Sequence, residues 1–457
     1  MVIKNHSNLQ TTTASYLQSI YTDVLQRSPH EVEFHQAVKS LLDSIAPMLS
    51  QHPNYIKTGV LERLVEPERM ITFRVPWLDD QGNVHVNRGF RVQFNSAIGP
   101  YKGGLRFHPS VNSSIMNFLG FTQTIKNALT GQAIGGAKGG ADFDPKGKSD
   151  LEIMRFCQSY MAELAHYIGA DLDIPAGDIG VGAREIGYLF GQYRRVHRQF
   201  EAGVFTGKGV DFGGSHGRTE ATGYGTIYFV RQMLKQLGDS LNHKTVIVSG
   251  SGNVSIFAIE KAIELGANVV ACSDSDGYIY DKNGLHLPTI KRLKLDEDQR
   301  ICEYLTDHPE AIYVEGCDRI WGIPCDIALP CATQNELDEY AAEQLIDNGV
   351  TIVAEGANMP CTQEAINLFL DKGVSFGPAQ AANAGGVAVS ALEMAQNSAR
   401  VAWSFEQVDQ MLQKIMKTIY ENSMRAAKDY DLDGNLVAGA NIAGFKRVAD
   451  AMVAQGI

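Results

Sequence analysis

The stretch KTVIVSGSGNVSIFAIEKAIELGANVVACSDSDG, residues 244–277, decides the fold of the C-terminal half of the chain. It opens with a β-branched apolar run, passes through Gly250 and Gly252, and continues into a segment with helical periodicity. A second apolar run then ends at the acids Asp274 and Asp276. A strand, a Gly-x-Gly turn, a helix and a second strand that ends in acids form the pattern of a dinucleotide-binding βαβ unit.

The glycine turn and the start of the following helix are the expected contacts for the dinucleotide. These residues are Gly250, Ser251, Gly252, Asn253 and Val254. The third small position of the pattern holds Ser255, where Gly or Ala is usual, so the strand and the helix must pack around a hydroxymethyl group. A tight strand-to-helix turn that binds no ligand is the alternative interpretation.

Further runs on the C-terminal side repeat the alternation of strand and helix. A helix is predicted over residues 218–238, before the βαβ unit, and strands are predicted within CDIALP (325–330), TIVAEGAN (351–358) and VSFGPAQ (374–380). Because helical stretches separate these apolar runs, a parallel, doubly wound sheet is expected from about residue 206 onward.

The N-terminal half has a different pattern. Residues 12–66 show helical periodicity with charged faces, and two alternating runs within 69–95 flank a Gly-Asn turn, which predicts a β-hairpin. A helix is expected over 151–169, with its core-facing stripe formed by Leu151, Met154, Cys157, Met161, Leu164 and Ile168. The sequence therefore predicts an α/β fold with two domains.

Length, charge and cysteine usage limit the functional classes. A chain of 457 residues is too long for one ordinary core, and a net charge of -12 argues against a nucleic-acid partner. The N-terminal stretch MVIKNHSNLQ lacks an apolar signal core, and no apolar run reaches membrane-spanning length, so a cytoplasmic location is expected. The seven cysteines are odd in number and show no C-x-x-C spacing, which favours reduced, mostly packed thiols. His30 and His35 are five residues apart, which does not suit a shared zinc-binding face.

Three lysines of the N-terminal half stand in unusual surroundings. Lys138 lies between glycine pairs in IGGAKGGADFDPKG (134–147), Lys102 lies in GPYKGGLRFHP, and Lys126 lies in FTQTIKNAL. Lys138 does not belong to a phosphate-binding loop, because that motif needs glycine before the lysine and Ser or Thr after it. Several lysines near one pocket suit a substrate with two carboxylates, and they also lower one another's pKa. Lys138 could then act as a base or activate water, with Asp178 of PAGDIGVGARE carrying protons.

Long motifs in both halves resemble one enzyme family. GPYKGGLRFHPSVN (99–112), GGAKGGADFDPKGKSD (135–150), AEGANMP (354–360) and ANAGGVAVSALEMAQN (382–397) are similar to the small-subunit, hexameric, NADP-dependent type of glutamate dehydrogenase in the Glu/Leu/Phe/Val dehydrogenase family. The resemblance implies reversible oxidative deamination of L-glutamate to 2-oxoglutarate and ammonium. It also implies a substrate-binding and oligomerisation domain over 1–205, joined by a return helix at 432–457, a Rossmann domain over 206–431, and a homohexamer.

The resemblance implies a role for each candidate residue. Lys138 would polarise the 2-oxo group and activate the attacking water, and Asp178 would shuttle protons. The remaining roles are substrate α-carboxylate binding by Lys126, Gln123 and the backbone at Gly177, side-chain carboxylate binding by Lys102 and Ser390, nicotinamide contacts by Thr222 and Asn253, and a cleft lined by Asn358 and Asn383. The glycines around Lys138 would let the substrate and the nicotinamide approach closely.

The residues that would select between NAD and NADP favour different cofactors. An acid such as Asp274 at the end of the second strand favours NAD, because it accepts a hydrogen bond from the ribose 2′-hydroxyl. The stretch CSDSDG nevertheless resembles NADP-using members of the family, with Ser275 at the phosphate and Lys291 or Arg292 assisting, so NADP is expected over NAD. Two other functions remain open, a relative that acts on leucine, valine or phenylalanine and a non-catalytic dinucleotide sensor. No metal is expected.

Overall fold

The computed structural model describes residues 2–456, with side chains from residue 13 on, and the chain forms two compact units. The first unit holds the residues up to 216, 390–408 and those from 441 on, and the second holds 217–389 and 409–440. The two-part α/β architecture is confirmed. The boundaries differ from those expected at 205/206 and 431/432, because 206–216 and 390–408 belong to the first unit and 432–440 to the second.

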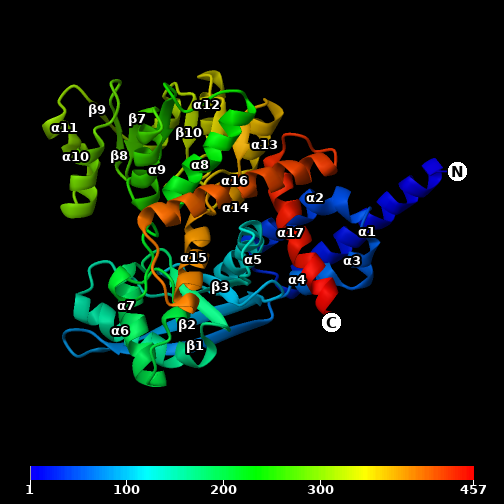
Figure 1. Ribbon diagram of the computed structural model, residues 1–457, viewed down its shortest axis with the longest axis horizontal. Coiled ribbons are helices and arrows are strands. Elements are labelled where there is room, and N and C mark those ends of the chain that lie inside the picture. The colour runs from blue at the N-terminus through cyan, green and yellow to red at the C-terminus, as the bar shows by residue number, and fades with distance from the viewer. Residues whose placement is uncertain (1, 457) are drawn as a thin grey trace. The chain divides into compact units, whose positions relative to one another are not determined.

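The N-terminal arm is helical, as predicted. Its helices are α1 (Val2–Arg27), α2 (Val32–Leu49), α3 (Pro53–Lys57) and α4 (Val60–Leu64), labelled in Figure 1. The buried side chains of α2 include Phe34, Val38, Leu41 and Ile45, whose spacing of three and four residues forms one apolar stripe. His30 precedes α2, and a ring nitrogen of His35 lies 2.6 Å from the backbone oxygen of Ser28.

The sheet of the first unit has five strands in the spatial order β1-β2-β4-β3-β5. The strands are β1 (Arg69–Leu78), β2 (Val84–Asn95), β3 (Tyr101–Phe107), β4 (Gly136–Ala141) and β5 (Asp173–Gly177). The predicted hairpin is confirmed, since β1 and β2 pair antiparallel from Leu78 and Val84 outward. Strands β3, β4 and β5 run parallel, with Leu105 of β3 beside both Gly139 and Gly177. This register brings the three chain segments that carry Lys102, Lys138 and Asp178 to one part of the sheet.

Three helices cover this sheet. They are α5 (Ser113–Leu129), α6 (Asp150–Leu164) and α7 (Ala183–His197), with short 3-10 turns η1 (Ala165–Tyr167), η2 (Ala202–Val204) and η3 (Val210–Phe212). Helix α5 packs on β2 and β4, whereas α6 packs on β1 and α7. The stripe expected on α6 is partly wrong, since Leu151 is exposed and Met154 is only half-buried. Cys157, Met161 and Leu164 are buried as expected. Ile153, Phe156 and Tyr160 are buried beside them, because the larger aromatic side chains fill the core.

Three C-terminal helices each contain residues of both units. They are α15 (Gly385–Ala399), α16 (Phe405–Asp429) and α17 (Leu436–Gln455). In the first unit, the guanidinium of Arg447 on α17 donates hydrogen bonds to the backbone oxygens of Ala128, Gly131 and Gln132, at 2.7, 2.9 and 2.8 Å. These bonds tie α17 to the end of α5 and to the turn that follows it.

The second unit contains the predicted doubly wound sheet. Its spatial order is β12-β11-β10-β6-β7-β8-β9, with β6 (Thr245–Val248), β7 (Asn268–Ser273), β8 (Gly277–Tyr280), β9 (Ile312–Glu315), β10 (Ile327–Leu329), β11 (Ile352–Ala354) and β12 (Ser375–Gly377). Five neighbouring strands are parallel, as expected. Strand β8 adds on antiparallel, because the three-residue connection after β7 allows only a hairpin, and β9 pairs antiparallel with β8 after a longer connection. The strand order reverses between β6 and β10, which is where such sheets bind their ligands.

Helices separate the strands of the second unit. They are α8 (Ala221–Gln236), α9 (Asn253–Glu264), α10 (Leu287–Lys291), α11 (Tyr304–Asp307), α12 (Glu339–Asp347), α13 (Gln363–Asp371) and α14 (Ala379–Ala382), with the short turns η4 (Arg292–Asp296), η5 (Ile301–Glu303) and η6 (Cys317–Gly322). Of the seven cysteines, all but Cys302 and Cys317 are buried. No helix within residues 2–456 is both long and apolar enough to cross a membrane.

Candidate active site

Lys138 and Asp178 form a buried ion pair in the first unit. The Nζ atom of Lys138, on β4, lies 2.9 Å from Oδ2 of Asp178, which directly follows β5. Their side chains are 4% and 14% exposed. Burial lowers the pKa of Lys138, the nearby Arg106 and Arg91 lower it further, and the Asp178 carboxylate opposes them. The expected cationic influence on this lysine is present, but it comes from two arginines that the sequence reasoning did not single out.

The pKa of Asp178 is held well below its usual range. Burial alone would raise it, but Lys138 and Arg106 both place a positive charge on the carboxylate and outweigh that effect. The Nε atom of Arg106 donates to the same Oδ2 atom at 2.8 Å. An arginine in the motif GGLRFHP is therefore part of the site, and no local pattern marks it, because its partner lies 72 residues away.

Gly136 and Gly139, which flank Lys138, allow close packing of protein atoms, whereas the sequence suggested that they leave space for ligands. A Cβ atom at Gly136 would lie 2.0 Å from Oγ1 of Thr124, so this glycine lets α5 pack on β4. A Cβ atom at Gly139 would lie 2.8 Å from both a side-chain carbon of Leu105 and the backbone oxygen of Phe90. Protein atoms, rather than open space for ligands, thus occupy the positions beside these two glycines.

Gly104 is the glycine that borders the ion pair. A Cβ atom there would lie 2.9 Å from Cβ of Asp178 and 3.4 Å from Nζ of Lys138. Contacts below 3.0 Å between such atoms require a shift of one of them. The lack of a side chain on the central strand therefore allows the lysine and the aspartate to meet across it.

The residues expected to bind the two substrate carboxylates lie on β3, α5, β5 and α15. Lys102 is 1% exposed, and its backbone oxygen accepts a hydrogen bond of 3.0 Å from Nδ2 of Asn127. Oδ1 of Asn127 in turn accepts one of 2.6 Å from Nε2 of Gln123. Lys126 lies one turn after Gln123 and is half-buried, Gly177 ends β5, and Ser390 on α15 is 1% exposed. Asn127 thereby ties the β3 lysine to the helix that carries two other candidates.

A second buried ion pair anchors the α15 segment that carries Ser390. Nζ of Lys208 lies 2.6 Å from Oε1 of Glu393, and both side chains are fully buried. Lys208 also donates to Oδ1 of Asn397 at 2.9 Å, and Oε2 of Glu393 accepts from the Gly207 backbone at 2.9 Å. The pair holds the TGKG loop, which has the wrong spacing for a phosphate loop, to the helix one turn after Ser390. The sequence reasoning missed this role of Lys208.

Replacing Lys208 by methionine is expected to destabilise the protein by about 3–5 kcal/mol, because Glu393 would remain as a buried charge without its main partner. Thermal unfolding measures the change as a lower Tm. The exposed Lys146 provides a matched control, and Lys146→Met should leave the Tm unchanged. The double variant Lys208→Met/Glu393→Leu should recover stability relative to the single variant. Equal Tm values for Lys208→Met and wild type would contradict a stabilising role for the pair.

The glycine turn of the second unit has the predicted form. Gly250 adopts a positive φ of 81°, and Gly252 stands at the N-cap of α9 without a side-chain cap bond. Ser255 is 1% exposed and donates to the backbone oxygen of Ser249 at 2.7 Å, so its hydroxyl is satisfied inside the packed turn. The departure from Gly or Ala at this position is therefore compatible with the fold. Asn253 and Val254 begin α9, whose first backbone N–H groups lack helical partners and suit an anion.

The two acids after β7 have different partners, since Asp274 accepts hydrogen bonds from the backbone and Asp276 pairs with Arg300. Oδ1 of Asp274 accepts from the backbone of Asp276 at 2.9 Å, and Oδ2 accepts from the backbone of Ile301 at 3.2 Å. This carboxylate, whose side chain is 5% exposed, thus holds the surrounding loop together. Ser275 is exposed, and its Oγ accepts a hydrogen bond of 2.8 Å from Nη1 of Arg300.

The basic residue hydrogen-bonded to Ser275 is Arg300, whereas the sequence singled out Lys291 and Arg292. Lys291 pairs with Glu260 on α9. Arg292 pairs with Glu297 and Asp307, at 2.7 and 2.6 Å. Arg300 also has an acidic partner, since its Nε lies 3.2 Å from Oδ2 of Asp276, and what distinguishes it is its hydrogen bond to Ser275. Arg300 was missed because it lies 25 residues from Ser275, outside any local motif.

The other three residues expected at the cofactor lie around the ends of α8, β11 and α14. Thr222 is the second residue of α8, and a Cβ atom on Gly386 would lie 2.5 Å from its Oγ1. Asn358 is exposed in the loop after β11, and Asn383 donates from Nδ2 to the backbone oxygen of Gly356 in the same loop. Burial raises the pKa of Glu355, at the start of this loop, to about 7. The carboxylate of Glu355 accepts from the backbone of Ala379 at 2.7 Å, so it joins the loop to α14.

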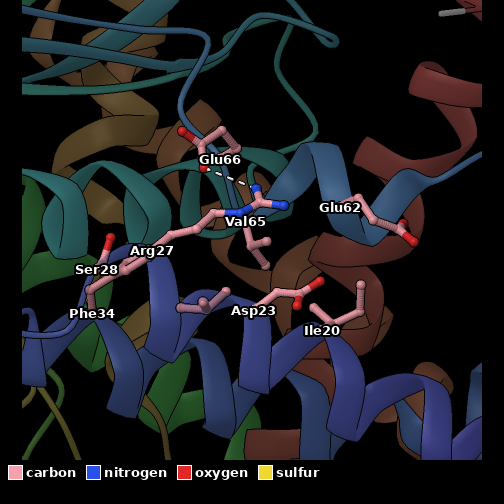
Figure 2. Close-up of a pocket in the computed structure, with 9 residues that line it drawn as sticks. Ile20, Asp23, Arg27, Ser28, Phe34, Glu62, Val65 and Glu66 are labelled. Carbon is pink, nitrogen blue, oxygen red and sulfur yellow. Dashed lines mark ion pairs between the residues drawn. The ribbon is translucent and has the colours of Figure 1, made fainter.

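A pocket formed by residues of the N-terminal arm lies among α1, α2 and α4 of the first unit (Figure 2). Its lining residues are Ile20, Asp23, Val24, Arg27, Ser28, Phe34, Glu62, Val65 and Glu66. Figure 2 shows the ion pair between Arg27 and Glu66 as a dashed line. The two groups are 3.5 Å apart, and both side chains are more than half exposed. The lining includes none of the residues expected to bind substrate or cofactor.

Known proteins are similar to this chain over most of its length. The second unit has the sheet of a dinucleotide-binding domain, and the first supplies a buried Lys–Asp pair, which together define a two-domain dehydrogenase-like protein. Two family models match: "Glu/Leu/Phe/Val dehydrogenase, dimerisation domain" over residues 67–195 and "Glutamate/Leucine/Phenylalanine/Valine dehydrogenase" over 213–456. The chain belongs to the Glu/Leu/Phe/Val dehydrogenase family.

Individual relatives are similar over nearly their full length. The NADP-specific glutamate dehydrogenase of Helicobacter pylori is 55% identical over 97% of this chain and 100% of its own. The protein of the same name from Escherichia coli is 55% identical over 96% and 98%. Among solved structures, Plasmodium falciparum glutamate dehydrogenase matches with a TM-score of 0.95 and 49% identity, over 98% of this chain and 96% of its own.

Proposed function

We propose that this protein catalyses the reversible, NADP-dependent oxidative deamination of L-glutamate to 2-oxoglutarate and ammonium. Relatives named NADP-specific glutamate dehydrogenase, at 55% identity over nearly the whole chain, support the reaction and the cofactor. The observation that carries the chemistry is the buried contact of Lys138 with Asp178. A lysine whose pKa is lowered by burial is neutral in a larger fraction of molecules than an ordinary surface lysine, so it is better able to accept a proton as a base.

In the proposed reaction, NADP held at the turn of Gly250 and Gly252 would supply the acceptor for the hydride of Cα, and the substrate, after its ammonium has lost one proton, would become an iminium at that carbon. Neutral Lys138 then accepts a proton from water as the water oxygen adds to that carbon. The protonated Lys138 then returns this proton to the amine, and the hydroxyl proton passes to the leaving ammonia, so that ammonium leaves and the 2-oxo group forms. Asp178 stays ionised and paired with the lysine during these transfers. The lysine can thus act as a base in one step and as an acid in the next.

The two substrate carboxylates are assigned to separate lysines. Lys126 and Gln123, one turn apart on α5, would hold the α-carboxylate together with the backbone N–H of Gly177. Lys102 and Ser390 would hold the side-chain carboxylate. The nearly complete burial of Lys102 and Ser390 supports this assignment, because charge-assisted hydrogen bonds are strongest where water is excluded.

The cofactor is assigned to the second unit. The turn of Gly250, Ser251 and Gly252 and the first residues of α9, Asn253 and Val254, would hold the pyrophosphate and neighbouring groups at the helix N-terminus. Thr222, Asn358 and Asn383 would lie toward the nicotinamide. The exposed hydroxyl of Ser275, paired with Arg300, suits the 2′-phosphate that distinguishes NADP from NAD. Asp274 keeps its backbone partners and would shape this loop rather than bind the ribose directly.

Replacing Ser275 by glutamate is expected to lower kcat/KM for NADP by about tenfold to a hundredfold, because the new carboxylate repels the 2′-phosphate and competes for Arg300. Efficiency with NAD should be unchanged or higher. Arg300→Gln should also weaken NADP use, whereas Arg292→Gln is the matched control, since Arg292 pairs with other acids. Steady-state assays with both cofactors measure the ratio. If Ser275→Glu and Arg300→Gln both leave it at the wild-type value, the 2′-phosphate binds elsewhere.

The proposed function is tested by following the absorbance of the reduced nicotinamide with NADP and with NAD. Glutamate, leucine, valine and phenylalanine are offered in turn. Turnover of glutamate with NADP supports the proposal. Turnover confined to the other amino acids would assign the protein to another activity of its family, and cofactor binding without any turnover would indicate a sensor.

We also propose that the protein is a homohexamer. The matched family model over 67–195 is described as a dimerisation domain. A hetero-hexameric glutamate dehydrogenase from Thermus thermophilus matches with a TM-score of 0.80 at 29% identity, over 89% of this chain and 95% of its own. A cytoplasmic location, expected from the sequence, stays a prediction.

A further inference from the structure

Two cations share a single oxygen atom of Asp178. Nε of Arg106 lies 2.8 Å from Oδ2, and Nζ of Lys138 lies 2.9 Å from the same atom. All three side chains are at least 86% buried, since their exposed fractions are 11%, 4% and 14%. The site is therefore a cluster of three charges in which one carboxylate stands between an arginine and a lysine.

The strand β3 places Arg106 at this position. Side chains alternate between the faces of a strand, so Lys102, Gly104 and Arg106 project from the same face of β3. Gly104 leaves space for Asp178 to approach Lys138, and Arg106 lies one step further along the same face, beside Gly140 of β4. The fold thus brings a permanent cation to the catalytic pair without inserting a side chain between its members.

The other charged groups near Lys138 come from neighbouring elements. Arg91 of β2 also lowers the pKa of this lysine, but it forms its own buried pair with Asp173 of β5, with a hydrogen bond of 2.9 Å from Nε. Lys102 lies on β3, and Lys126 lies on α5, which packs on β4. Arg106 is the cation that contacts the partner of Lys138 directly.

We propose that Arg106 is a positioning residue that keeps the Asp178 carboxylate charged and paired while Lys138 gains and loses its proton. This inference rests on the proposed function. An aspartate paired with lysine alone would favour the ammonium form strongly and would become a buried, unpaired anion whenever the lysine turned neutral. Arginine stays protonated throughout and continues to donate to Oδ2. It therefore reduces the stabilisation that Asp178 gives to the protonated form of Lys138, so that the neutral form of this lysine is more populated.

The test compares Arg106→Gln, Arg106→Lys and wild type over pH 6–10. In the pH profile of kcat/KM for glutamate, one limb reports the protonation of Lys138. The apparent pKa of this limb should be similar in wild type and in Arg106→Lys. In Arg106→Gln, which removes the charge, this limb should move upward by about one pH unit or more. Arg88→Gln is the matched control, because Arg88 is an exposed arginine of the same sheet, and it should not move the limb.

A second measurement reads Lys138 without relying on turnover. An amine-selective acylating reagent is applied across the same pH range, and modification of Lys138 is quantified by peptide mass spectrometry. The half-modification pH should rise in Arg106→Gln in parallel with the kinetic limb. This readout remains valid if wild type turns over no glutamate, an outcome that would refute the proposed function while still testing the role of Arg106.

Three outcomes decide the matter. Upward shifts in Arg106→Gln, with wild-type values retained in Arg106→Lys, support the inference. A folded Arg106→Gln protein that binds NADPH and shows the wild-type profile by both measurements overturns it. If Arg106→Gln does not fold, Arg106→Lys decides alone: a wild-type acylation profile supports the role of charge, and a shift of a full unit refutes it.

Discussion

Glutamate turnover by Lys138→Ala is expected to fall by at least about a thousandfold, because the change removes an acid-base group and a local positive charge together. The structure also predicts that the variant folds. Asp178 would keep its 2.8 Å bond to Arg106, so that the buried carboxylate would not be left unpaired. Alanine itself suits the small surroundings of β4. The loss should therefore be one of catalysis rather than of structure.

The measurement follows kcat with saturating glutamate and NADP. Thermal unfolding and NADPH fluorescence test whether fold and cofactor binding persist. Lys146→Ala, an exposed lysine eight positions further along the same glycine-rich segment, is the matched control and should retain full activity. Retention of more than a tenth of wild-type turnover by Lys138→Ala would assign the proton transfers to another group.

The double variant Lys102→Leu/Ser390→Val is expected to reverse substrate preference. Glutamate differs from norvaline by one side-chain carboxylate, and a buried ammonium with a hydroxyl offers that group charge-assisted hydrogen bonds. Norvaline has no group to accept them. Discrimination of about a thousandfold is within the range that a polar recognition site achieves. The apolar replacements should therefore collapse kcat/KM for glutamate while sparing or raising it for norvaline.

Steady-state assays measure the ratio of kcat/KM for glutamate to kcat/KM for norvaline. A smaller fraction of active enzyme in a variant lowers both values equally and does not change this ratio. The single variants serve as controls and show whether Lys102 or Ser390 contributes more. An unchanged ratio in a folded double variant would mean that the side-chain carboxylate is recognised elsewhere. Because Ser390 lies one turn before Glu393, the Tm of each variant must also be compared with wild type.

Most secondary structure could be predicted from local patterns. The hairpin of β1 and β2, the glycine turn before α9 and the runs that became β10, β11 and β12 all have the expected type and place. Two details were wrong for identifiable reasons. The connection from β7 to β8 is too short for a crossover, so the sheet continues antiparallel. On α6 the buried face includes Cys157, Met161 and Leu164 as expected, but it extends to Phe156 and Tyr160 and leaves Leu151 exposed, because helical spacing alone does not fix the exact centre of the buried face.

The candidate site was predictable only where its residues carry a local signal. Lys138 stood out among glycines, and Asp178 stood out in a short glycine-bounded turn. Arg106 and Arg300 carried no such signal, because arginines are common and their partners lie elsewhere in the chain. Motif resemblance supplied the substrate roles of Lys102, Lys126 and Ser390, which spacing alone would not have suggested.

By itself, the sequence determined the β1–β2 hairpin, the alternation of strands and helices around the glycine turn, the two-part α/β organisation and the family. These properties follow from periodicity, turn chemistry and long motifs, each of which is written in neighbouring residues. Only the tertiary structure decided which charges pair. Arg106 lies 72 residues from Asp178, and Lys208 lies 185 residues from Glu393. Burial makes such pairs strong and shifts their proton affinities, and burial depends on how distant segments pack.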